Sequence, residues 1–184
     1  MRERRRRVGA LALALLGAAC AAGGGSSAGE RPADGVPAGA PAAGDAGADT
    51  AVVVALRRGE CFGACAAYEA TITRGGAVRI EGRGRSASRA PWRSTVPRDS
   101  VGALLAAFER SGFLALRDRY VPGEPGCGQA ATDHPSATLT VTLGGRTKSV
   151  DHYHGCRDAP AELRMLENQV DSLARTGRWL ERGG

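Results

Sequence analysis

The segment ATLTVTLGGRTKSVDHY, residues 137–153, decides the fold class because it has the alternating pattern of a β-hairpin. Up to Leu143, small or branched apolar residues alternate with threonine; Gly144-Gly145 follows, and a second strand is predicted from Arg146 to Tyr153. A period of two places the apolar side chains on one face of a sheet and the threonines on the other. A glycine pair also accepts the positive φ of a tight hairpin turn. The segment therefore predicts two antiparallel strands with one buried face and one face in water.

The same pattern occurs once earlier in the chain, and an apolar strand precedes it. Tyr68, Ala70 and Ile72 alternate with polar residues, Gly75-Gly76 marks the turn, and residues 78–80 (VRI) continue beyond it. Residues 51–56 (AVVVAL) form a short apolar run, which predicts a buried strand. We therefore expect at least five strands in two hairpins and one single strand.

A helical pattern follows each hairpin. The first helix is predicted to begin at Pro97 and end at Gly112, and the second to begin at Pro160 and end at Gly177. Both carry apolar residues at helical spacing along one face: Val101, Leu104, Leu105 and Phe108 in the first, and Leu163, Leu166, Val170 and Leu173 in the second. The order β-ββ-α-ββ-α predicts an α+β fold, in which two helices pack on one face of a mostly antiparallel sheet.

The chain of 184 residues divides into three parts. All eight aromatic residues lie beyond residue 50, so we expect a single folded domain at residues 50–184. Residues 20–49 consist mainly of alanine, glycine, proline and serine, a composition typical of a flexible linker. Residues 1–19 combine a basic start with an apolar run, and we expect them to be a signal peptide.

The N-terminus also carries a candidate lipidation site. The uncharged run at residues 8–19 is too short to span a bilayer, as the apolar core of a signal peptide is. It ends in Leu16-Gly17-Ala18-Ala19-Cys20, which resembles the lipobox of bacterial lipoproteins and implies that Cys20 becomes the lipidated first residue. Ordinary signal-peptide cleavage is the alternative, because Ala19-Cys20-Ala21 also fits the Ala-x-Ala rule. We expect an exported protein, held by lipid to a membrane of the cell envelope and facing the periplasm or the outer surface.

The charge distribution argues against nucleic-acid binding. The chain has 25 lysines and arginines against 19 acidic residues, a net charge of +6. Without the first seven residues the balance falls to 20 basic against 18 acidic residues. Binding to phosphates needs a basic surface on the folded part of a protein, so we expect no nucleic acid among the partners.

The domain has four cysteines, and an even number in an exported chain predicts two disulfides. Cys61 and Cys65 can close a tight loop, and Cys127 with Cys156 would join the segments on either side of the second hairpin. These two pairs are favoured, and the other pairings stay open at this stage. On the chain-entropy model the short loop contributes about 2 kcal/mol and the longer one about 3.5 kcal/mol.

A zinc site is the alternative interpretation of the same region. Cys127, His134, His152, His154 and Cys156 are zinc-binding residue types, and both His152 and His154 lie on one face if the strand extends that far. However, no pair has the spacing of a structural zinc site, and export favours oxidised thiols. We therefore expect no metal and no cofactor.

One polar constellation remains as a candidate site: Asp133-His134 and Asp151-His152, with His154 two residues further on. A histidine beside a carboxylate can act as a general base, but neighbours on a strand point to opposite faces. The usual hydrolase and nucleotide-binding motifs are not found, and we name no catalytic residue. The leading hypothesis is a disulfide-stabilised binding or structural module for an unknown protein or envelope ligand. The alternative is a hydrolase or metal-binding enzyme that uses His134, His152 and His154.

The domain resembles a bacterial family of unknown function found in exported proteins and lipoproteins. The family's C-F-G-x-C-P-x-Y signature is matched by residues 61–68 (CFGACAAY), with Ala66 in place of the proline. Further matches are residues 112–120 (GFLALRDRY), 132–135 (TDHP), 152–155 (HYHG) and 160–167 (PAELRMLE). The resemblance covers about residues 51–176. It implies the domain boundaries and export, and it implies no established activity.

Overall fold

The structure is a computed structural model and describes residues 43–182. The predicted signal peptide, Cys20 and the linker up to residue 42 lie outside the described residues. Helix α1 (Ala43–Thr50) covers the last part of the predicted linker, so residues 43–49 are helical. Alanine favours helix, and the end of α1 is tied to the domain by a hydrogen bond from the Gly75 amide to the Asp49 carbonyl (2.8 Å).

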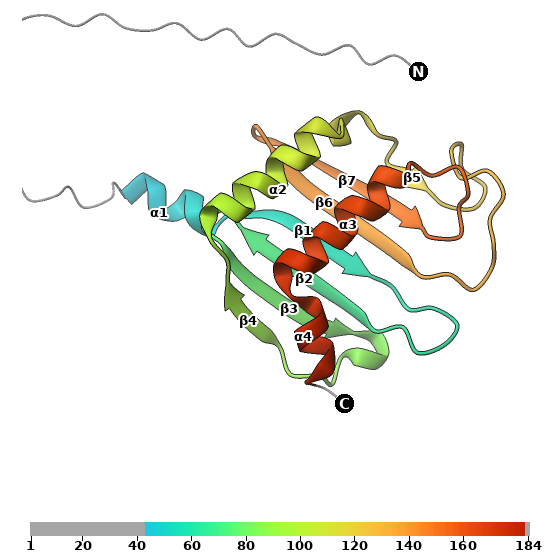
Figure 1. Cartoon of the computed structure of the whole chain (residues 1–184), viewed down its shortest axis with the longest axis horizontal. Helices are drawn as coiled ribbons and strands as arrows, with labels where there is room; N and C mark the ends of the chain where they lie inside the picture. The colour runs from blue at the N-terminus through green and yellow to red at the C-terminus, as the bar shows by residue number, and fades with distance from the viewer. Residues whose placement is uncertain (1–42, 183–184) are drawn as a thin grey trace, which may run out of the picture. The chain divides into compact units, whose positions relative to one another are not determined.

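The centre of the domain is a seven-stranded sheet (Figure 1). Its strands lie in the order β4-β3-β2-β1-β6-β7-β5. Every neighbouring pair is antiparallel except β5 with β7, which is parallel. The strand bounds are β1 (Val52–Arg58), β2 (Ala67–Thr73), β3 (Ala77–Arg83), β4 (Trp92–Thr95), β5 (Arg119–Tyr120), β6 (Ser136–Leu143) and β7 (Arg146–Tyr153).

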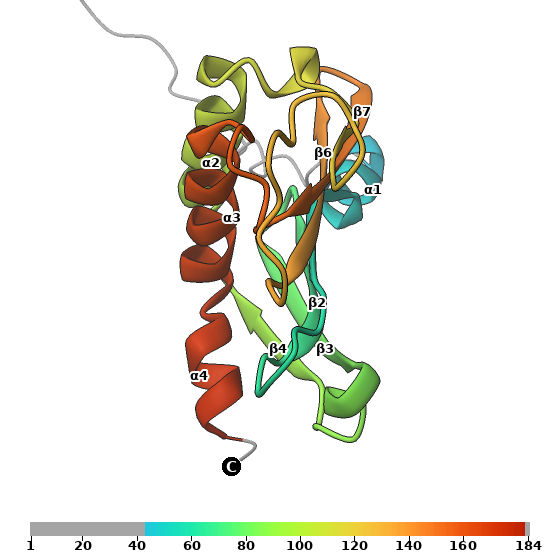
Figure 2. The same cartoon turned by 90° about the vertical axis from the view of Figure 1, so that its right-hand side faces the viewer.

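The main helices cover one face of this sheet. Figure 2 shows helix α2 (Arg98–Arg110), helix α3 (Ala161–Ala174) and helix α4 (Thr176–Glu181) on the same side of the strands. Two short 3₁₀ turns, η1 (Gly84–Ser86) and η2 (Phe113–Ala115), complete the elements. The predicted α+β fold, with a mostly antiparallel sheet and helices on one face, is therefore confirmed. No helix of residues 43–182 is long and apolar enough to cross a membrane.

The core lies between the sheet and the helices, and the predicted alternation explains it. In β6, Ala137, Leu139, Val141 and Leu143 are buried, whereas the threonines between them are partly exposed. The apolar stripes of α2 and α3 face the sheet, with Phe108 and Leu163 fully buried. At the turn between β6 and β7, Gly144 (φ 54°) and Gly145 (φ 78°) both have positive φ, as the hairpin requires.

Three details differ from the sequence prediction. Strands β4 and β5 add one strand to each edge of the sheet, and both are too short to show a period in sequence. The second predicted helix ends at Ala174 rather than at Gly177. Arg175 takes the left-handed conformation (φ 59°) and separates α3 from α4, and Gly177 lies inside α4.

The four cysteines form the two favoured disulfides, Cys61–Cys65 and Cys127–Cys156. Their Cα atoms are 5.5 Å and 4.5 Å apart, respectively. The first closes the loop between β1 and β2. The second joins the loop before β6 to the segment after β7, where a β-bridge between Ala130 and Cys156 holds the same two segments together. Both bonds therefore lie in the connections at one end of the sheet.

Candidate functional site

A row of inward-facing positions crosses the sheet near the end of β1. The strand register pairs Arg58 with Tyr68 on one side and with Ala137 on the other, and pairs Ala137 with His152. These residues continue the buried alternation of their strands, so Arg58, Tyr68 and His152 point towards the helices. The small Ala137 between them leaves room above the sheet. The row therefore sets three polar side chains below α3.

Helix α3 contributes two carboxylates to the same place. Glu167 and Asp171 are four residues apart, which puts them on one face of the helix. Glu167 is completely buried (0 % exposed), and it lies on the face that also buries Leu163 and Val170. His154, one residue beyond β7, completes the group. We call this set of six the α3 polar cluster: Arg58, Tyr68, His152, His154, Glu167 and Asp171.

The carboxylate of Glu167 accepts three hydrogen bonds. His152 Nδ1 donates to Oε1 (2.7 Å), while His154 Nε2 (2.7 Å) and Arg58 Nη1 (2.6 Å) donate to Oε2. Burial raises the pKa of Glu167, but the two imidazole N–H groups and the arginine charge outweigh it and lower the pKa to about 2. Glu167 is therefore ionised at neutral pH, and both contacting imidazole nitrogens carry a proton.

Asp171 is the second anion of the α3 polar cluster. Its Oδ2 accepts from Arg58 Nε (3.2 Å) and Nη2 (2.8 Å), and its Oδ1 accepts from the Tyr68 hydroxyl (2.6 Å). Burial, followed by the negative charge of Asp171, raises the pKa of Tyr68 above its ordinary value. The phenol is consequently a fixed donor and not a nucleophile. One arginine thus bridges two helical carboxylates, and the cluster fastens α3 to three strands.

Part of this cluster has the composition of a metal site. The ligand atoms of His152, His154 and Glu167 lie within 4.8 Å of one another. Zinc bonds to such atoms are about 2 Å long. However, Arg58 Nη1 lies 2.6 Å from Glu167 Oε2 and 3.1 Å from His154 Nε2, so an ion bound to both would lie against the guanidinium. The geometry favours hydrogen bonding around a positive charge that the chain itself supplies.

A pocket of about 420 Å³ opens beside the α3 polar cluster. Its wall includes four members of the cluster, together with Arg164 and Asn168 of α3 and with Cys65 at the end of the disulfide loop. The cluster members are Arg58, Tyr68, His154 and Asp171. We call this hollow the α3 pocket. It is a concave surface whose polar floor is held in place by buried charges.

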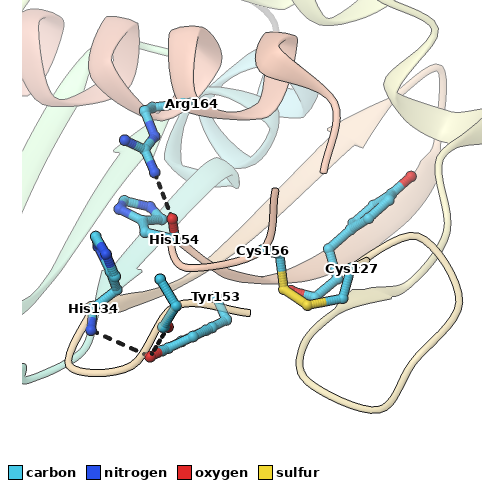
Figure 3. Close-up of a disulfide and its surroundings, with 8 residues drawn as sticks. Cys127, His134, Tyr153, His154, Cys156 and Arg164 are labelled. Carbon is cyan, nitrogen blue, oxygen red and sulfur yellow. Dashed lines mark hydrogen bonds between the residues drawn. A yellow bond between two sulfur atoms is a disulfide. The ribbon is translucent and has the colours of Figure 1, made fainter. Parts of the chain in front are cut away.

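The five residues expected to form a polar site are divided by the structure. His152 and His154 belong to the α3 polar cluster, as the alternation of β7 allows. Asp151 points away from them and accepts a hydrogen bond from the Thr138 hydroxyl (2.8 Å). Asp133 and His134 lie on the exposed loop before β6, where the His134 amide donates to the Tyr153 hydroxyl (3.2 Å; Figure 3). The structure does not bring these three to His152 and His154.

The zinc site considered from sequence loses two of its five candidate ligands. Cys127 and Cys156 are bonded to each other, so they offer no thiolates (Figure 3). Arg164 Nη2 donates to the His154 carbonyl (2.8 Å), and the Tyr153 hydroxyl donates to the Ala131 carbonyl (2.9 Å).

Four residues of the α3 polar cluster were not predicted as site residues: Arg58, Tyr68, Glu167 and Asp171. A signal was present, because Arg58 follows Val54 and Leu56 at inward positions of β1, and Glu167 falls on the apolar stripe of α3. A charged residue at an inward position needs a partner. Charges on predicted core faces therefore mark Arg58 and Glu167 as site residues, whereas Tyr68, which is neutral, and Asp171 carry no such signal.

A comparison with protein families finds one match. The model described as a domain of unknown function (DUF6438) matches residues 52–174. None of the curated proteins compared with this chain matches it.

Proposed function

The chain belongs to the family of the domain of unknown function DUF6438, and from that premise we propose that it is an exported, lipid-anchored protein of the cell envelope whose domain binds a partner through the α3 pocket. The match at residues 52–174 confirms a domain of unknown function close to the expected limits of residues 51–176. The signature at residues 61–68 and export stay part of the proposal.

Support for export comes from the cysteines and the N-terminus together. All four domain cysteines are consumed in two disulfides, which is typical of proteins that fold in an oxidising compartment. The arginine-rich start, the short apolar run and Cys20 have the order of a lipoprotein signal. Twenty-two residues lie between Cys20 and the start of α1 at Ala43, enough chain to hold the domain away from a membrane surface.

The observation that carries the binding function is the saturation of the buried charges below the α3 pocket. The carboxylates of Glu167 and Asp171 already accept hydrogen bonds from Arg58 and Tyr68. The raised pKa of Tyr68 keeps its hydroxyl protonated. Groups engaged in this way stabilise the shape of a pocket and do not attack a substrate. A preformed, partly polar hollow is the usual form of a ligand site.

The anchor is tested by labelling the full chain with radioactive palmitate in a bacterial host that processes lipoproteins. We expect label on the wild type and none on Cys20→Ser. An exported wild-type chain without label would refute the anchor.

The binding function is tested in living cells with a photo-crosslinking amino acid in place of Pro135, which lines the α3 pocket and is not part of the α3 polar cluster. The same amino acid in place of Arg146, at the opposite end of β7, is the control. We expect a discrete adduct from position 135 alone. No adduct, or the same adducts from both positions, would refute a partner at this pocket.

A hydrolase is the second candidate, and one observation favours it. His154 lines the α3 pocket, and its Nε2–H is held by the buried carboxylate of Glu167, while its Nδ1 has no partner among the described residues. A carboxylate that orients an imidazole in this way is the arrangement of a general base. Hydrolysis of p-nitrophenyl acetate that falls in His154→Gln but not in His134→Gln would support this function. Equal rates in both variants would exclude it for this probe.

A further inference from the structure

We infer that the α3 pocket recognises a carboxylate on its ligand, with Arg164 and Asn168 as the recognition pair. This inference rests on the proposed binding function and names the chemistry of the ligand. It follows from the hydrogen bonds of the α3 pocket wall, where some polar groups already have a partner and others do not.

The carboxylate of the pocket wall is engaged. Asp171 accepts from Arg58 and Tyr68, and its Oδ1 accepts in addition from the Thr176 hydroxyl (3.2 Å). Arg58 in turn directs its three nitrogens at the two helical carboxylates. A ligand cation would therefore find no unpaired carboxylate here, and it would approach two guanidinium groups.

The unengaged groups are donors on one face of α3. Arg164 makes a single hydrogen bond within residues 43–182, from Nη2 to the His154 carbonyl (2.8 Å), and its remaining N–H groups are unused. The amide oxygen of Asn168 accepts from Arg58 Nη2 (3.4 Å), and its NH₂ group has no partner among the described residues. Positions 164 and 168 are four apart, so the two donors lie side by side.

This pair matches a planar anion. A guanidinium presents parallel N–H groups at the spacing of the two oxygens of a carboxylate, and such pairs are shorter and stronger than neutral hydrogen bonds. The hydrogen bond from Arg164 to the His154 carbonyl (Figure 3) restrains this side chain, so less side-chain freedom is lost on binding. The free carboxylate of a peptide C-terminus and that of an acidic sugar share this chemistry.

Calorimetric titration of the purified full chain with matched probes tests the inference. The peptide arm compares acetyl-Ala-Ala with its C-terminal amide, and the sugar arm compares glucuronate with glucose. We expect at least one acid to bind about tenfold more tightly than its neutral counterpart, since a charged hydrogen-bonded pair contributes at least that factor. The arm that shows the preference identifies the source of the carboxylate.

Variants assign the effect to residues. Arg164→Ala should reduce binding of the preferred acid to the level of its neutral counterpart, and Arg164→Lys should restore part of it. Arg146→Ala, an exposed arginine at the far end of the sheet, should bind as the wild type does. Equal affinity for acid and neutral probe, or a loss in Arg146→Ala as large as in Arg164→Ala, would overturn the inference. An absence of binding by both acids at about 10 mM would also overturn it. In that case a photo-crosslinked adduct from position 135 would still support the proposed binding function.

Discussion

The replacement of Glu167 by glutamine is the sharpest test of the α3 polar cluster. Glutamine keeps the size of the side chain and removes its charge, so Arg58 loses one of its two anions and an imidazole N–H faces an amide NH₂. Removing one partner of a buried, hydrogen-bonded ion pair costs about 3 to 5 kcal/mol. Because Asp171 still holds Arg58, we expect the lower end, about 3 kcal/mol.

The pH dependence gives an independent value for the same interaction. The pKa of Glu167 is about 2 in the folded protein against 4.5 for a free glutamate. A lowered folded pKa means that the stabilisation is complete above pH 4.5 and is lost as the pH falls from 4.5 towards 2. The difference in pKa corresponds to about 3 kcal/mol. The difference in unfolding free energy between the wild type and Glu167→Gln should therefore be about 3 kcal/mol at pH 7 and close to zero at pH 2.

Urea unfolding of the full chain, followed by tryptophan fluorescence, measures this difference. Trp179 is a suitable reporter because it is buried (3 % exposed) and packs edge-on against Tyr68. Glu109→Gln is the matched control, since Glu109 is exposed on α2, and its stability should change by less than about 0.5 kcal/mol. A loss below about 1 kcal/mol at pH 7 in Glu167→Gln, or a loss that persists at pH 2, would refute the account of the cluster.

Three further predictions concern the disulfides, metal ions and the hydroxyl donor. Replacing Cys127 and Cys156 together by serine should lower the unfolding free energy by about 3.5 kcal/mol, and replacing Cys61 and Cys65 by about 2 kcal/mol, because the longer loop restricts the unfolded chain more; a reversed order in urea unfolding would contradict this. Neither zinc nor a chelator should shift the melting temperature in a thermal-shift assay, because a guanidinium lies against the histidine–glutamate group; a rise with zinc would show that the arginine gives way. Tyr68→Phe removes one hydrogen bond to a carboxylate and should cost about 2 kcal/mol in urea unfolding with an unchanged circular dichroism spectrum; a neutral substitution would show that the hydroxyl contributes little.

The fold was predictable where the chain repeats a period long enough to be seen. The hairpin at residues 137–153 and the apolar stripes of α2 and α3 identified the layers and the buried faces correctly. The two-residue strand β5 could not be found, because it is defined by its parallel pairing with β7 and not by any pattern of its own. The end of α3 was misplaced because a glycine is the commoner stop, whereas here Arg175 takes the left-handed conformation.

The candidate site was predicted only in part, because charged residues were assumed to face water. His152 and His154 were predicted as site residues from their chemistry, and Asp151 and His134 with them. The structure does not bring Asp151 or His134 to the two histidines of the cluster. Glu167 lies near the middle of α3 (Ala161–Ala174) on its apolar face, where a search for an apolar period passes over a charged residue. Its partners come from strands more than 90 residues earlier or from β7, and no local pattern connects them.

The α3 polar cluster also has a consequence for the order of events as the chain is made. Strands β1 to β4 pair with their neighbours in sequence and can form a meander soon after synthesis. Arg58, however, meets Glu167 and Asp171 only after 109 and 113 further residues. Until helix α3 leaves the ribosome, the end of β1 holds a positive charge that cannot be closed off from water. A chain interrupted before Asp171 should therefore stay open to proteases and chaperones, and the arrival of the last long helix is the step that converts it into a closed domain.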